Sequence, residues 1–145
     1  MKNKILVVAV HPDDETLGCG GTLLKHKHNG DEIYWLICTK IDEGSDYYAV
    51  RENEIKQASD IYKFDGVFSL GLKTMRVDEY SMRDLIGKIS KVINEVEPSI
   101  IYLPFKGDVH SDHRKIFEAS YSCTKADSYT HLRAHETKAN LVCRL

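Results

Sequence analysis

Short apolar runs alternate with amphipathic segments along most of the chain. The apolar runs predict strands, and the segments between them, whose apolar positions recur at helical spacing, predict helices. The expected strands are residues 4–10, 31–38, 66–70 and 99–103, and the expected helices are about 18–27, 47–62, 82–96 and 112–123. Strands and helices that alternate at this spacing form βαβ units. We therefore expect an α/β fold around a mostly parallel sheet, whose right-handed crossovers bring the ends of the first and fourth strands to one edge.

The pattern changes after about residue 125. Residues 126–145 contain no apolar run that predicts a strand, only the compact pair Leu141-Val142, and show no helical periodicity. We therefore expect one domain at 1–125, incomplete at its C-terminus. We expect 126–145 to be a tail that is not native to the fold and carries no chemistry.

Composition excludes several classes of protein. The 145 residues predict one domain. The net charge of −2 comes from interspersed acidic and basic residues, so no basic stripe predicts a nucleic-acid partner. Six apolar residues before His11 are too few for a signal peptide or a membrane span. Four cysteines without a Cys-x-x-Cys pair predict reduced thiols, a cytoplasmic location and no cysteine-based zinc site.

A cluster of ionisable residues follows the first expected strand directly. The sequence Val10-His11-Pro12-Asp13-Asp14-Glu15 places one imidazole and three carboxylates at the carboxyl end of a buried strand. Ligands bind at this edge of open α/β sheets. Such a concentration of carboxylates predicts a cation there.

A second cluster, His110-Ser111-Asp112-His113, follows the fourth expected strand. Catalytic zinc takes three protein ligands from His, Asp or Glu and leaves one position for water. His11, Asp14 and His113 could form such a set, with the distant histidine supplied by the fold. Isolated histidines are more often solvated, and we expect this of His26 and His28.

The remaining polar residues of the two clusters suit catalytic functions. Asp13, beside the ligands but outside the set, could deprotonate the attacking water. His110 could stay unliganded and donate to a developing oxyanion or leaving amine. Asp112 could orient one of the histidines, and Glu15 fits a helix start or an outer-shell position.

Two stretches resemble a known family. Ala9-Val10-His11-Pro12-Asp13-Asp14-Glu15, followed by Leu17-Gly18-Cys19-Gly20-Gly21, resembles the first motif of the LmbE-like, or PIG-L, zinc-dependent deacetylases. His110-Ser111-Asp112-His113 resembles their second motif, and Arg51-Glu52-Asn53-Glu54 resembles an Arg-x-x-Glu helix start. The resemblance covers about residues 4–123.

The resemblance implies a Rossmann-like, three-layer α/β/α fold and removal of the N-acetyl group from an N-acetylglucosamine-type glycoside. It assigns zinc to His11, Asp14 and His113, the general base to Asp13 and transition-state stabilisation to His110. It implies that Arg51 contacts the substrate, whereas a surface ion pair with Glu54 or Glu52 is the alternative.

The same motifs are compatible with other functions. A metal-dependent hydrolase of another amide or ester would use the same residues, and a carbohydrate-binding fragment with impaired turnover would keep them. A magnesium phosphohydrolase is disfavoured, because magnesium prefers oxygen-rich sites. The expected partner is a small N-acetylated sugar; the sequence does not indicate an oligomeric state.

Overall fold

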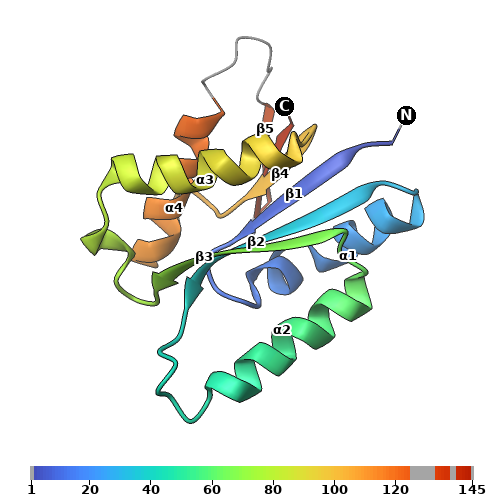
Figure 1. Cartoon of the computed structure of the whole chain (residues 1–145). Helices are drawn as coiled ribbons and strands as arrows, with labels where there is room; N and C mark the ends of the chain where they lie inside the picture. The colour runs from blue at the N-terminus through green and yellow to red at the C-terminus, as the bar shows by residue number, and fades with distance from the viewer. Residues whose placement is uncertain (1, 125–132, 138–139, 145) are drawn as a thin grey trace.

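A computed structural model describes residues 2–124, 133–137 and 140–144. In chain order the elements are β1 (Lys4–Ala9), α1 (Asp14–His28), β2 (Glu32–Lys40), α2 (Tyr48–Tyr62), β3 (Gly66–Lys73), the 3-10 turn η1 (Val77–Glu79), α3 (Met82–Val96), β4 (Ile100–Leu103), α4 (Ser111–Cys123), β5 (Arg133–Thr137) and β6 (Asn140–Arg144). Figure 1 shows the sheet with α1 and α2 on one face and α3 and α4 on the other.

The sheet has the strand order β3-β2-β1-β4-β6-β5. β1, β2, β3 and β4 are parallel, whereas β6 and β5 join antiparallel beyond β4. The chain therefore moves outward from β1 in one direction through β2 and β3, and returns to the other side of β1 with β4. A ligand site is expected where the direction of winding reverses, at the carboxyl ends of β1 and β4.

Both faces of the sheet are covered, which confirms the expected three-layer α/β/α architecture (Figure 1). Alternate residues of β1 point to opposite faces of the sheet. Leu6 and Val8 pack toward α3 and α4, and Ile5 and Val7 pack toward α1 and α2. Because both faces of β1 are buried, its sequence is a continuous apolar run.

The helix α3 shows how the sequence determines one of these layers. Ser81 caps its first turn, because the Ser81 hydroxyl accepts a hydrogen bond from the backbone N–H of Asp84. Its buried residues recur at helical spacing and form one face toward the sheet: Leu85, Ile89, Val92 and Val96. None of the described helices combines the length and apolarity needed to cross a membrane.

Two expectations about the elements are wrong. The helix α1 begins at Asp14 instead of near residue 18, because the Asp13 carbonyl already accepts N–H groups from Thr16 and Leu17. The glycine-rich segment bends this helix at Cys19 (φ −142°, ψ 20°). The expectation of no strand after residue 125 is also wrong, since β5 and β6 extend the sheet by backbone pairing. That 126–145 is not native to the fold stays a prediction.

Candidate metal centre

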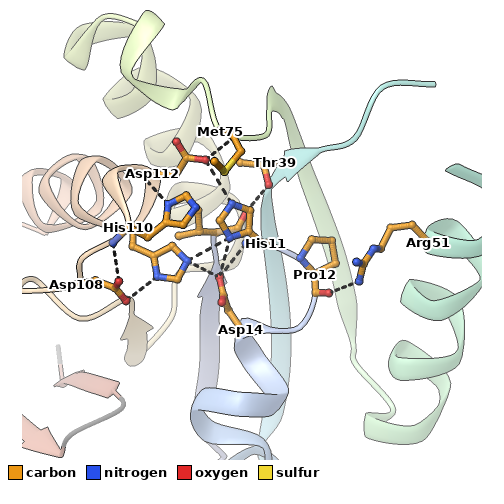
Figure 2. Close-up of polar contacts among 11 residues, drawn as sticks. His11, Pro12, Asp14, Thr39, Arg51, Met75, Asp108, His110 and Asp112 are labelled. Atoms are coloured by element: carbon orange, nitrogen blue, oxygen red, sulfur yellow. Dashed lines mark hydrogen bonds and ion pairs between the residues drawn. The ribbon is translucent and has the colours of Figure 1, made fainter. Parts of the chain in front are cut away.

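The two polar clusters meet at the carboxyl ends of β1 and β4 (Figure 2). His11 lies in the turn after β1, and Asp14 is the first residue of α1. His113 lies in the first turn of α4, on the segment that follows β4. Since residues 11 and 113 are 102 positions apart, only the return of the chain to β4 brings them together.

His11, Asp14 and His113 form a compact triad of donor atoms. His113 Nε2 lies 3.2 Å from His11 Nδ1 and 3.3 Å from Asp14 Oδ2. His11 Nδ1 lies 3.9 Å from the same Asp14 oxygen. The backbone N–H of His11 donates to Asp14 Oδ2 at 2.8 Å, which fixes this carboxylate against the turn.

A second carboxylate behind each histidine determines which nitrogen faces the triad. His11 Nε2 lies 3.3 Å from Asp112 Oδ2, and His113 Nδ1 lies 2.9 Å from Asp108 Oδ2. An ionised carboxylate only accepts, so each of these nitrogens carries the proton. His11 Nδ1 and His113 Nε2 then direct lone pairs at one another and at Asp14. Three lone pairs in such proximity repel unless positive charge lies between them, either a proton shared by the groups or a metal ion, so the donor set fits a cation.

The pKa shifts of Asp14 and His113 also indicate a site that favours positive charge. Burial of Asp14 would raise its pKa, but hydrogen bonds from His113 and the His11 backbone outweigh this effect and hold the pKa below its ordinary value. The Asp14 hydrogen bond raises the pKa of His113, against the opposing effect of burial. The structure thus favours positive charge beside an ionised Asp14.

His110 lies next to the triad but differs from the other two histidines. Nitrogen atoms of His11, His110 and His113 all lie within 4.8 Å of one another, so the three rings could also hold a metal. However, His110 Nδ1 accepts the backbone N–H of Asp112 at 3.1 Å and caps α4. The neutral ring therefore carries its proton on Nε2, which makes that atom a hydrogen-bond donor. On this ground Asp14 is a better third ligand than His110.

Asp112 is fully buried and joins three parts of the site. In addition to His11, it accepts the backbone N–H of Met75 at 2.8 Å and that of Val77 at 3.2 Å. The carboxylate thereby ties the segment before η1 to the back of His11, on the side away from the triad (Figure 2). Asp112 positions His11 and is shielded from substrate.

Asp13 and Glu15 lie on either side of Asp14 in the sequence but have opposite environments. Asp13 is exposed, and its carboxylate has no hydrogen bond or ion pair with the described residues. Glu15 is 2% exposed, and burial raises its pKa although Thr16 donates to it. Asp13 is therefore available to solvent and substrate, whereas Glu15 lies inside the first turn of α1.

Arg51 lies on α2 and reaches the turn that carries the first cluster. Its Nη1 donates to the Pro12 carbonyl oxygen at 3.0 Å and lies 3.3 Å from Glu54 Oε2. The surface ion pair with Glu54, which the sequence offered as the alternative to substrate contact, is thus present. The side chain is still 37% exposed, beside Asp13, where it can also meet a ligand.

The sequence did not single out Asp108 and Thr39 for this site. Besides holding His113, Asp108 accepts the backbone N–H of His110 at 2.9 Å and therefore organises the whole second cluster. Thr39, at the end of β2, donates its hydroxyl hydrogen to the Val10 carbonyl beneath His11 at 2.8 Å. A carboxylate five residues before a histidine was the one signal available for Asp108.

The expectation that His26 is solvated is wrong, whereas His28 is exposed as expected. His26 contacts Asp31 through Nδ1 at 2.7 Å and the Tyr102 hydroxyl through Nε2 at 2.9 Å. This contact joins α1 to β4, and its part in the molecule is structural.

The fold and the site define an α/β protein with a cluster of histidines and carboxylates that could hold a metal ion, where the winding of its sheet reverses. The chain belongs to the PIG-L family, described as GlcNAc-PI de-N-acetylase, whose model matches residues 6–124.

Relatives are known in both sequence and structure. A "Probable N-acetyl-alpha-D-glucosaminyl L-malate deacetylase 2" of Bacillus anthracis is 28% identical over 133 residues, which cover 82% of this chain and 59% of the relative. A diacetylchitobiose deacetylase of Thermococcus kodakarensis is 27% identical over 122 residues, covering 77% of this chain and 45% of the relative. The structure of a conserved protein from Thermus thermophilus is similar with a TM-score of 0.74 and 28% identity, over 85% of this chain and 56% of the other. The chain thus spans about half of the length of these relatives, between 45% and 59%.

Proposed function

We propose that this protein is a zinc-dependent hydrolase that removes the N-acetyl group from an N-acetylglucosamine-type glycoside or sugar conjugate. The convergence of His11 Nδ1, His113 Nε2 and Asp14 Oδ2 carries the proposal, because second carboxylates turn the lone pairs of both rings toward one point. Two imidazoles and one carboxylate are a ligand set that suits zinc. The substrate class is supported by the family and by the names of the two deacetylases that match most of this chain.

His11, Asp14 and His113 would hold the zinc ion. When bound, zinc polarises the amide carbonyl and lowers the pKa of water at the site. The exposed carboxylate of Asp13 accepts a proton from the attacking water, whose oxygen forms the new bond to the carbonyl carbon. The carbonyl oxygen gains negative charge, and the Nε2–H of His110 donates a hydrogen bond to it.

Collapse of this state breaks the carbon–nitrogen bond. The proton held by Asp13 passes to the departing nitrogen, so that the products are acetate and a free amine. Asp112 and Asp108 keep the two ligand histidines in their tautomers throughout. Arg51, fixed to the Pro12 carbonyl beside Asp13, would contact the sugar. A cytoplasmic location remains a prediction.

The test combines metal analysis with product analysis of the purified chain. We expect one zinc per chain and zinc-dependent acetate release from N-acetylglucosaminides. Hydrolysis of other amides or esters in preference to these would favour the alternative hydrolase. Sugar binding without any zinc-dependent turnover would contradict the enzymatic function and favour a carbohydrate-binding fragment.

A further inference from the structure

An apolar cavity lies directly beside the metal centre. Its volume is about 170 Å³, and it lies where β1 and β4 separate after their last pair, Val7 and Tyr102. Three ionisable residues contribute to its lining: Asp14 and His113 of the triad, and Asp108. The other residues that line it are mainly apolar and include Leu17, Cys19, Tyr102 and Phe105. We call this space the acyl cavity.

Cys19 belongs to the apolar part of this wall in spite of its thiol. Burial raises its pKa to about 12, so the thiol is neutral at physiological pH. A neutral thiol that is mostly covered packs as a small apolar group. The bend of α1 at this residue places Cys19 beside the acyl cavity.

The opposite side of the metal centre is polar. A cavity of about 350 Å³ lies between α1 and α2, and Asp13, Arg51 and Glu54 contribute charges to its lining. Figure 2 shows Arg51 and Asp108 on opposite sides of Asp14 and His11. An amide held at the triad therefore has charged, hydrogen-bonding surroundings on one side and, beyond Asp108, a mainly apolar space on the other.

We propose that the enzyme hydrolyses N-acyl sugars whose acyl chain is longer than acetyl, with the chain in the acyl cavity and the sugar toward Arg51. The inference rests on the proposed function and specifies its substrate class. An engineered apolar cavity of about 150 Å³ accepts benzene, which has six carbons. The acyl cavity is slightly larger, so it accepts the five carbons beyond the carbonyl of a hexanoyl group, whereas an acetyl methyl leaves most of it unfilled.

The chemistry of the step is unchanged by chain length. Water adds its oxygen to the acyl carbon, the carbon–nitrogen bond breaks, and the proton passes to the amine. The products are the glucosamine amine and a medium-chain carboxylate in place of acetate. The carboxylate leaves with its chain still in the acyl cavity, so it should also bind as a product inhibitor.

The first experiment compares glucosaminides that differ only in their N-acyl group: acetyl, butyryl, hexanoyl and dodecanoyl. We expect kcat/KM for hexanoyl to equal or exceed one tenth of the acetyl value, and the dodecanoyl value to fall at least tenfold below hexanoyl. A hexanoyl value below one tenth of the acetyl value overturns the inference and leaves the proposed function intact. No release from any of the four amides overturns the proposed function, and the inference with it.

The second experiment fills the cavity. The substitution Cys19→Met adds volume to the wall, and we expect it to lower the hexanoyl-to-acetyl ratio of kcat/KM at least tenfold. Leu24→Met is the matched control, since Leu24 lies on the same helix and is 48% exposed. An equal ratio in the Cys19 variant and the control overturns the placement of the chain.

A binding measurement on the unaltered protein makes the test independent of any variant. Each methylene that leaves water tightens binding by about fourfold. Hexanoate should therefore inhibit acetate release with an inhibition constant at least ten times lower than that of acetate. Inhibition constants closer than this overturn the inference.

Discussion

His113 donates from Nδ1 to Asp108 Oδ2 at 2.9 Å, and this one bond makes Nε2 of the same ring available to the metal centre. His11 is held the other way round, because its Nε2–H donates a hydrogen bond to Asp112 and Nδ1 stays available. The two histidines therefore present different nitrogens from two parts of the chain. In both cases a carboxylate that does not belong to the triad decides the tautomer.

Removal of Asp108 should weaken metal binding. We expect Asp108→Ala to lower zinc affinity about 10- to 100-fold, because His113 loses the partner that orients its ring. A competitive chelator titration measures this affinity. Asp60→Ala is the control, since Asp60 is an exposed carboxylate whose side chain pairs with Lys56. Equal zinc affinities in the two variants would contradict the function assigned to Asp108.

Asp13→Ala should separate catalysis from metal binding. We expect kcat to fall by about 10² to 10⁴, as for loss of a general base, with zinc content unchanged. Stability should also be unchanged, because the Asp13 side chain makes no capping hydrogen bond to α1. Acetate release and metal content are measured on the same sample. Full activity of this variant would show that Asp13 is not the base.

Gly20 and Gly21 should respond in opposite directions to alanine. A Cβ at Gly20 would lie 2.5 Å from the Tyr62 hydroxyl oxygen, so Gly20→Ala should destabilise the fold by about 1–3 kcal/mol. A Cβ at Gly21 meets nothing within 4 Å, so Gly21→Ala should stabilise α1 by about 0.5–1 kcal/mol. Urea unfolding measures both effects.

The contact with Tyr62 can be tested separately by a double-mutant cycle. Tyr62→Phe removes the oxygen that the new Cβ would meet, although it also removes the hydrogen bond to Thr16. Gly20→Ala should therefore cost less in the Tyr62→Phe background, with a coupling of about 0.5 kcal/mol or more. Additive effects would show that the destabilisation has another cause.

The contact between Asp31 and His26 should make stability depend on pH. The hydrogen bond with His26 is the largest effect on Asp31, and with those from Asn3 it outweighs burial and lowers the pKa of Asp31. A carboxyl whose pKa is lower in the folded state stabilises the fold above its unfolded pKa of about 4, and the contribution is lost as pH falls through the folded pKa.

Asp31→Asn should consequently lower the free energy of unfolding by about 1–3 kcal/mol at pH 7. The difference from the unsubstituted protein should narrow below about pH 4. Denaturant unfolding at pH 7, 5 and 3 measures it. A difference that stays constant over this range would show that the ionised carboxylate is not the stabilising species.

The parallel part of the sheet could be predicted because burial leaves a direct trace in the sequence. β1 is covered on both faces, so it is a run of apolar residues, and α3 repeats its buried residues at helical spacing. β5 and β6 leave no such trace, since backbone pairing along β4 places them in the sheet without an apolar run. The glycines after Leu17 predict a helix start at a place where α1 has a bend, and α1 itself begins at Asp14.

The candidate ligands could be proposed from the order and spacing of the two clusters, but their orientation could not. The sequence contains nothing that decides which imidazole nitrogen is protonated, because that depends on Asp108 and Asp112 in three dimensions. The contact of His26 with Tyr102 was missed for the same reason, since 76 residues separate them. The roles assigned to His11, Asp13, Asp14, His110 and His113 stay predictions.

The separation of the two ligand histidines gives the metal centre a thermodynamic consequence. An ion shared by His11 and His113 joins positions 102 residues apart, so it closes a loop that contains most of the parallel sheet. In the chain-entropy model a cross-link of that span restricts the unfolded chain by about 4–5 kcal/mol. Metal binding would therefore stabilise the folded domain reversibly. Chelation of the metal would lower the melting temperature, as reduction does in a disulfide-linked protein.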